Sequence, residues 1–133
     1  MTIGEVAKLA GVNVQTLLYY ERRGIIPLPV RSARNHRVYS HETARRVRFI
    51  KRAQTMGFTL VEIKELLSLR ANEATRCSDV RTRVEAKMAS IEGKASVLLA
   101  MRESLAQLVE QCPGDAPVSI CPIIESFDSE NGG

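Results

Sequence analysis

The stretch that decides the fold is "TIGEVAKLAGVNVQTLLYYERRG", residues 2–24. Thr2 and Glu5 have the spacing of a capping box, and the apolar residues that follow predict a short amphipathic helix that ends at Gly11. Asn13 is typical of an N-cap, so a second helix is expected to run from there to the next glycine. Two helices joined by a tight turn that contains glycine indicate a helix-turn-helix.

The chain beyond this helix pair predicts a small wing and two more helices. In "IIPLPVRSARNHRVYS", residues 25–40, the prolines exclude helix and the β-branched ends favour a loop or a small two-stranded wing. A basic helix is expected over residues 41–56. Thr59 and Glu62 then form a second capping box for the helix that follows, and the aperiodic residues 71–77 are expected to be a linker.

Residues 78–111 predict one long helix, because they contain no proline and a single glycine. Steps of alternately four and three residues define a heptad seam in which seven of eight positions are apolar: Val84, Met88, Ile91, Ala95, Leu98, Arg102, Leu105 and Val109. A protein this small cannot bury such a stripe on a lone helix, so we expect the helix to pair with a second copy in a homodimer. The alternative is a helix folded back on the preceding residues.

Charge is divided between the two halves of the chain. Of the formal net charge of +4, residues 1–70 contribute 13 basic against 5 acidic side chains, and residues 71–133 contribute 6 against 10. This division suggests that the first half meets a polyanion and the second does something else, although a solvated basic surface is the alternative. The longest apolar run is far shorter than the ~20 residues of a membrane span, and no signal peptide is evident, so a soluble cytoplasmic protein is expected.

The residues that could contact DNA lie on the second helix and in the wing. A helix-turn-helix places its second helix in the major groove, where Gln15 could pair with an adenine edge. Arginine and tyrosine can hold phosphates, although Tyr20 could equally be a core residue. The candidates are Val14, Gln15, Thr16, Tyr19, Tyr20, Arg22 and Arg23 on the helix, and Arg31, Arg34 and Arg37 in the wing.

Three linked motifs carry a family resemblance: "TIGEVAKLAGVNVQTLLYYERRGIIP", "RVYS" and "RFIKRAQTMGFTLVEIKELL". They resemble the DNA-binding domain of MerR-type transcriptional regulators over most of residues 2–70. The resemblance implies a mainly α fold, with a winged helix-turn-helix followed by a long antiparallel coiled-coil dimerisation helix. It also implies DNA-facing positions at Gln15, Thr16, Tyr19, Tyr20, Arg37 and Tyr39.

The spacing of the three cysteines predicts a site shared between two chains. Cys77 and Cys112 lie at opposite ends of the long helix, roughly 50 Å apart, so one chain cannot use both for one ion. If two helices pair antiparallel, Cys77 of one copy meets Cys112 of the other. The loop "CPGDAPVSIC" is long enough to bring Cys121 to the same place. We therefore expect two identical three-thiolate sites per dimer.

Three thiolates suit a soft metal ion. Structural zinc prefers four ligands, and the two histidines, His36 and His41, belong to the wing region. The three-cysteine pattern with a loop ending in "CPII" closely resembles the mercuric-ion regulators of the MerR-type group, which implies Hg(II), with Pb(II) or Cd(II) as alternatives. Two further alternatives are a thiol redox sensor of the same fold and cysteines packed as small hydrophobic residues. No nucleophilic constellation accompanies the thiols, so an enzyme is not expected.

The predicted organisation has four parts: a DNA-binding domain over residues 1–70, a linker and dimerisation helix over 71–111, a metal-binding loop and short helix over 112–128, and a disordered tail over 129–133. The resemblance implies a homodimer that binds a pseudo-palindromic operator in promoter DNA. It implies repression without metal, and activation by DNA distortion, for RNA polymerase, when metal binds.

Overall fold

The computed structural model describes residues 1–129, and the expected disordered tail lies outside these residues except for Ser129. The described chain is mainly helical and forms two compact units, one over residues 1–87 and one that begins at Met88. The predicted boundary after residue 70 separates DNA binding from dimerisation. It therefore remains a prediction, since the two compact units are defined by packing alone. No helix in residues 1–129 combines the length and the apolar character needed to cross a membrane.

The first two helices form the helix-turn-helix. Helix α1 covers Ile3–Ala10 and α2 covers Val14–Arg22. The expected capping box is present, because the Thr2 hydroxyl accepts the Glu5 N–H at 3.2 Å and the Glu5 carboxylate accepts the Thr2 N–H at 3.3 Å. Between the helices Gly11 has φ +74°, a left-handed conformation that glycine adopts without strain. Both predicted helices are confirmed.

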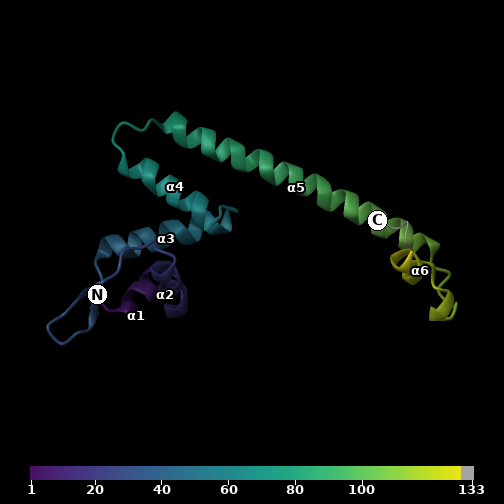
Figure 1. Ribbon diagram of the computed structural model, residues 1–133, viewed down its shortest axis with the longest axis horizontal. Helices are drawn as coiled ribbons and strands as arrows, with labels where there is room; N and C mark the ends of the chain where they lie inside the picture. The colour runs from purple at the N-terminus through teal and green to yellow at the C-terminus, as the bar shows by residue number, and fades with distance from the viewer. Residues whose placement is uncertain (130–133) are drawn as a thin grey trace. The chain divides into compact units, whose positions relative to one another are not determined.

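The wing follows α2 and is visible as the loop that projects between α2 and α3 (Figure 1). Strands β1, Val30–Arg31, and β2, Arg37–Val38, pair antiparallel with Val30 opposite Val38. Asn35 turns the chain between them with φ +62°. Asparagine tolerates this region better than most residues, which explains a tight turn without glycine. The two-stranded wing is therefore confirmed.

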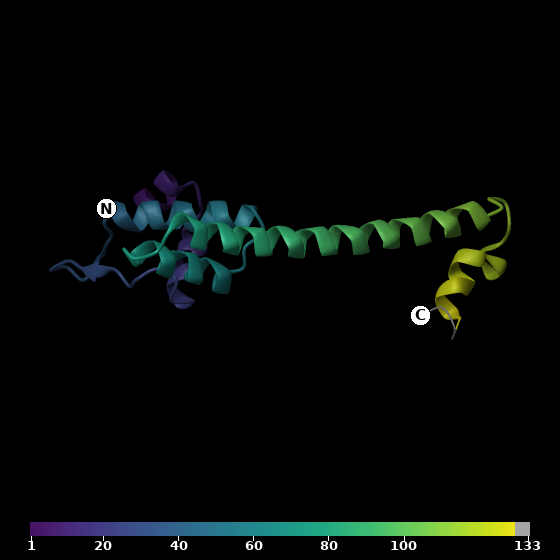
Figure 2. The ribbon, with the colours of Figure 1, turned by 90° about the horizontal axis from the view of Figure 1, so that it is seen from above.

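Helices α3, His41–Thr55, and α4, Leu60–Ala71, complete the core of the first unit. Helix α3 packs against α1 and α4 (Figure 2). The expected Thr59 and Glu62 capping box starts α4. The largest fully buried side chains come from α1, α2, α3, α4 and the start of the wing: Val6, Leu17, Tyr20, Ile25, Val47, Ile50 and Ile63.

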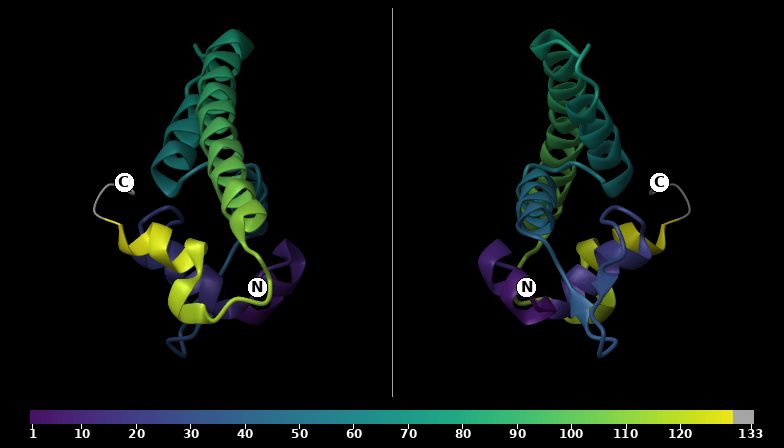
Figure 3. Two further views of the ribbon diagram at one scale, coloured as in Figure 1. Left: turned by 90° about the vertical axis from the view of Figure 1, so that its right-hand side faces the viewer. Right: turned by 90° about the vertical axis from the view of Figure 1, so that its left-hand side faces the viewer.

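Helix α5 is a single helix of 35 residues, Cys77–Gln111. Its first turns lie beside α4 in both views of Figure 3, and an ion pair of 2.7 Å joins Arg83 on α5 to Glu65 on α4. Most of the heptad seam is exposed in the described chain, including Met88, Ile91 and Leu98. Pairing of this exposed seam with a second copy remains a prediction.

The residues after α5 form two short helical elements. A 3-10 helix, η1, covers Val118–Ile120, and α6 covers Pro122–Asp128. The helical turn expected over residues 122–127 is thus confirmed and is one residue longer. The turn of η1 was not predicted, because a single turn of helix between prolines leaves no periodic pattern to detect.

Candidate nucleic-acid interface and metal centre

The N-terminal half of α2 presents the residues predicted to read bases. Gln15 is exposed, Thr16 is partly exposed, and 42% of Tyr19 is accessible. The Asn13 side chain caps α2 by accepting the Thr16 N–H at 2.7 Å, which fixes the start of the helix. The first turn of α2 is thus available to a ligand, as base contact requires.

A shallow polar hollow adjoins this part of α2. Its walls come from α2 with its cap and from α3: Asn13, Gln15, Thr16, Tyr19, Tyr20, Lys51 and Gln54. The α3 residues, Lys51 and Gln54, were not singled out from the sequence. Lys51 is exposed and brings a positive charge to the same surface as Gln15. Its position on the side of α3 toward α2 could have been read from the helical spacing of the basic helix.

Tyr20 belongs to the core. Only 1% of the residue is exposed, and its hydroxyl donates a hydrogen bond of 2.5 Å to the Gln54 side chain. Burial, with a smaller contribution from nearby Tyr19, raises the pKa of the Tyr20 hydroxyl. The group therefore remains a neutral donor at pH 7, and its predicted contact with DNA remains a prediction.

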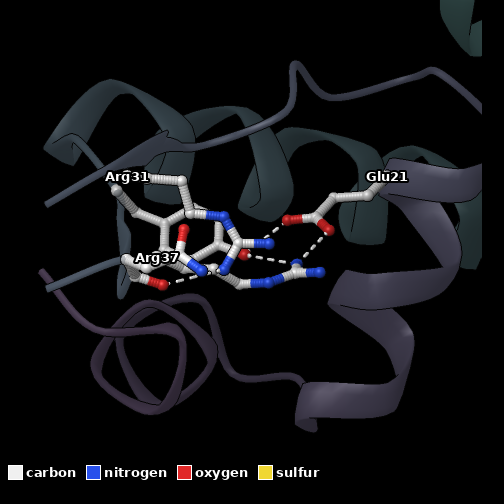
Figure 4. A network of polar contacts seen from close by, with 5 residues as sticks. Glu21, Arg31 and Arg37 are labelled. Atoms are coloured by element: carbon white, nitrogen blue, oxygen red, sulfur yellow. Dashed lines mark hydrogen bonds and ion pairs between the residues drawn. The ribbon is translucent and has the colours of Figure 1, made fainter.

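A buried polar network ties the wing to α2 (Figure 4). Glu21 on α2 is 8% exposed, and its carboxylate accepts the Tyr39 hydroxyl and an Arg37 guanidinium N–H, the latter at 2.5 Å. The same guanidinium nitrogen lies 3.2 Å from the Tyr39 hydroxyl oxygen. On the neighbouring strand, Arg31 donates to the Asn35 carbonyl at 3.2 Å. Arg37 and Tyr39 thus hold the base of the wing.

The Tyr39 hydroxyl and the Arg37 guanidinium of this network keep their protons near neutral pH. Burial, followed by the hydrogen bond to Glu21, raises the pKa of the Tyr39 hydroxyl, so it stays protonated and can donate. Hydrogen bonds to Tyr39 and Glu21 raise the pKa of the Arg37 guanidinium. Tyr39 is 3% exposed, and the Arg37 side chain is 32% exposed. Of Arg37 and Tyr39, only Arg37 therefore has enough exposed side chain to contact a phosphate.

Replacing Glu21 with alanine is expected to destabilise the first unit by about 2 kcal/mol, because the buried Tyr39 hydroxyl loses its acceptor and Arg37 its counter-ion. Urea unfolding followed by circular dichroism measures the change. Glu42→Ala is the matched control, since it breaks an exposed ion pair with Arg45; it should change stability by less than about 0.5 kcal/mol. Equal losses of unfolding free energy in the two variants would show that the buried Glu21 network stabilises the unit no more than an exposed ion pair does.

The other predicted basic residues are exposed. Arg22 and Arg23 lie at the end of α2, and Arg34 lies at the tip of the wing. None of these three has an ion pair to an acidic side chain within residues 1–129. Their positive charges are therefore available to a polyanion, as phosphate contacts require.

The three cysteines stand at the ends of helices. Cys77 is the first residue of α5, Cys112 follows its last residue, and Cys121 precedes α6. All three are free thiols; Cys77 and Cys112 are exposed and Cys121 is partly exposed. Within the described residues of one chain, no group of three histidine, cysteine or acidic side chains could hold a metal ion. Exposed thiols without disulfide partners nevertheless have the donor chemistry that soft metals select.

The loop between the last two thiols is ordered by turns. Gly114 adopts φ +86°, and η1 is closed by a hydrogen bond of 3.1 Å from the Cys121 N–H to the Val118 carbonyl. The Glu125 N–H in turn donates to the Cys121 carbonyl at 3.0 Å, which anchors Cys121 to the start of α6. The Cys112 N–H likewise donates to the Val109 carbonyl at 3.1 Å, so backbone hydrogen bonds hold the chain at both cysteines.

The helix-turn-helix, the paired wing and the exposed basic residues define a winged helix-turn-helix DNA-binding protein. The family model for the MerR HTH family regulatory protein matches residues 1–69, and the model for MerR, DNA binding, matches residues 44–108. The chain belongs to the MerR family. It is accordingly a DNA-binding transcription factor and not an enzyme, which confirms the predicted family and the mainly α fold with a winged helix-turn-helix and a long helix after it.

Several curated relatives align over nearly the whole chain. The mercuric resistance operon regulatory protein of Bacillus cereus is 41% identical over 125 residues, which cover 94% of this chain and 95% of that protein. The regulator of the same name from Serratia marcescens is 38% identical, with coverage of 98% and 89%. The HTH-type transcriptional regulator HmrR of Sinorhizobium medicae is 37% identical over 100% of this chain and 89% of that protein.

Two solved structures share the fold. The transcription regulator PbrR691 of Ralstonia metallidurans, in complex with lead(II), superimposes with a TM-score of 0.85 at 35% identity, and the alignment covers 96% of this chain and 98% of that one. The regulator MerR of Bacillus megaterium, in complex with mercury(II), gives a TM-score of 0.74 at 35% identity, with coverage of 97% and 100%.

Proposed function

We propose that this protein is an Hg(II)-responsive transcriptional regulator that binds promoter DNA as a homodimer. Membership of the MerR family carries the DNA-binding part of this proposal. The observation that carries the metal-binding part is the presence of three free, accessible thiols at the ends of α5 and at the start of α6. Several curated relatives are named for mercuric resistance.

We propose that each metal site draws Cys77 from one subunit and Cys112 and Cys121 from the other. Cys77 begins a helix of 35 residues and Cys112 follows its last residue, so the helix separates them by roughly 50 Å. The exposed seam on that helix supports pairing with a second copy, because its apolar side chains are left uncovered. Antiparallel pairing joins unlike ends, so it supplies three sulfurs at each end of the dimer.

The proposed DNA contacts divide by role. Gln15 and Thr16 would meet base edges, with Tyr19 and Arg22 beside them, and the exposed Lys51 adds a positive charge to the same surface. Arg34 and Arg37 would hold phosphates from the wing. Tyr20 and Tyr39 would act mainly by positioning these elements, because their rings are buried.

The mechanism follows from a two-fold symmetric dimer on a pseudo-palindromic operator. One helix α2 and one wing bind each half-site, with and without metal. Without metal the protein represses; metal binding changes the spacing or angle of the two DNA-binding units and thereby distorts the DNA, so that RNA polymerase can use the promoter. The thiolates of Cys77, Cys112 and Cys121 would hold the ion, and the ion would supply a link between the two subunits.

Pb(II) and Cd(II) are the alternative effectors. A specific observation supports the first, since the solved structure with a TM-score of 0.85 is a regulator in complex with lead(II). Three sulfur ligands accept all three soft ions, and the coordination number that the loop permits determines which ion binds best.

A metal titration of the reduced protein tests the proposal. We expect Hg(II) to bind with up to two ions per dimer and to remain bound against excess competing thiol, whereas Zn(II) should be removed because a fourth protein ligand is missing. Sulfur-to-metal charge-transfer absorption and equilibrium dialysis provide the measurement. Retention of Pb(II) or Cd(II) but not Hg(II) would show that the retained ion, and not Hg(II), is the effector. A response to peroxide without metal retention would instead favour a redox sensor.

A further inference from the structure

Lys87 is the one residue of α5 that is buried in the described chain, although the helix has 35 residues. Only 7% of Lys87 is exposed. A lysine ammonium is rarely buried without a partner, because removing the charge from water is costly. Its environment therefore indicates a specific contact.

The Lys87 ammonium contacts two side chains, one just before α4 and one in its first turn. Its Nζ lies 2.7 Å from the Glu62 Oε1 atom and 5.6 Å from the centre of the Phe58 ring. The first contact is an ion pair and the second has the geometry of a cation–π interaction. The ammonium thus joins α5 to the segment between α3 and α4.

Glu62 has a second partner at the start of α4. The same Oε1 atom accepts the Thr59 backbone N–H at 2.8 Å, as part of the capping box. The hydrogen bond to Lys87, followed by the bond to the Thr59 backbone, lowers the pKa of Glu62 to about 2. One carboxylate oxygen therefore connects the α4 N-terminus to α5.

The contact continues into α3 and then into α2. The Phe58 N–H donates to the Ala53 carbonyl at 3.1 Å, and the Phe58 side chain packs against the core. The next residue of α3, Gln54, accepts the Tyr20 hydroxyl and borders the hollow beside Gln15. Bonded and packed residues thus connect Lys87 to the surface that we propose to contact DNA.

We infer that Lys87 is a positioning residue that transmits displacement of α5 to the DNA-binding helices through Glu62 and Phe58. The inference rests on the proposed metal-responsive function. Cys77 lies on the same helix ten residues earlier, which is about 15 Å along a rigid rod. The ion pair is formed in this structure; breaking it on displacement of α5 would give a second arrangement, and elements with two arrangements can couple two sites.

A neighbouring ion pair provides a matched control. Arg83 and Glu65 also join α5 to α4 at 2.7 Å, one helical turn earlier on α5, but the two side chains are 51% and 47% exposed. Exposed pairs are screened by water and contribute little. Arg83→Met should therefore change the Glu62 pKa and the induction by metal only slightly, whereas Lys87→Met should change both strongly.

The first measurement needs no metal. Titration of the Glu62 carboxyl by NMR should give a pKa of about 2 in the parent protein. Lys87→Met should raise it by at least about one unit, because the largest cause of its lowering is removed, and Arg83→Met should leave it unchanged. An unchanged pKa in Lys87→Met would overturn the inference whatever the protein's response to metal.

The second measurement compares metal-dependent transcription with operator affinity. Lys87→Met should reduce the Hg(II) induction ratio by about tenfold and keep operator affinity without metal within about twofold, while Lys87→Arg should restore much of the induction because it keeps the positive charge. Circular dichroism checks folding, and Glu62→Gln is the second variant should Lys87→Met unfold. Parent-like induction in Lys87→Met and Glu62→Gln would overturn the inference, whereas a parent protein without any metal response would overturn the proposed function.

Discussion

Serine at any one of Cys77, Cys112 or Cys121 is expected to abolish induction by Hg(II) while operator affinity without metal stays within about twofold. A serine hydroxyl does not bind soft ions as thiolate does, so each substitution removes one of three ligands from both sites of the dimer. The thiols lie outside the core of the first unit, and the DNA-contacting surface should therefore remain intact. Reporter transcription and operator binding measure the two properties separately.

Ser119→Ala provides the control for the cysteine variants, because it alters an exposed side chain in the same loop without changing a sulfur. It should respond to metal like the parent protein. Loss of operator binding in all three cysteine variants would contradict the proposed division between metal and DNA surfaces. Normal induction in one variant would remove that residue from the site.

Leu98→Lys is expected to weaken dimerisation by at least about 100-fold and operator binding with it. Leu98 is a seam residue that is 64% exposed in the described chain. In an antiparallel dimer its replacement removes apolar burial from both copies and brings lysine charges into the seam. Sedimentation velocity at several protein concentrations measures the effect.

Val97→Lys is the matched control for the seam. Val97 is 55% exposed and adjacent in sequence, but it lies outside the heptad positions. Its substitution should leave the dimer largely intact. A dimer that is disrupted equally by both substitutions would indicate that α5 pairs through a different face.

Local signals explain why the first four helices could be predicted closely. The capping boxes at Thr2 and Thr59 use side chains within three residues of the groups that they bind. Asn13 likewise caps α2 through the backbone N–H three residues later. Such contacts depend on sequence spacing alone, so they are visible before any tertiary structure is known.

Tertiary contacts account for what the sequence did not reveal. Glu21 stands beside two arginines and has the appearance of a solvated charge, yet it is buried against Tyr39. Its spacing of four residues from the buried Leu17 was the available signal. The contact of Lys87 with Glu62 joins positions 25 residues apart and depends on how α4 and α5 lie together. No periodicity could have indicated it.

The candidate metal site could be predicted in part, because its ligands are recognisable from the sequence. Residue type and spacing identify three thiols at helix ends, and softness limits the ions that they favour. The assignment of the site to two subunits and the preference for Hg(II) remain predictions, because both depend on a second copy and on coordination geometry. Residue spacing alone predicts the sharing between subunits, and it contains no information on coordination geometry.

The exposed seam of α5 has a consequence for every stability measurement on this protein. A chain that leaves Leu98, Leu105 and Val109 more than half exposed gains stability when a second copy covers them. Its thermal midpoint should therefore rise with protein concentration, by mass action. Variants must be compared at equal concentration, since dilution of the parent protein would otherwise resemble a destabilising substitution.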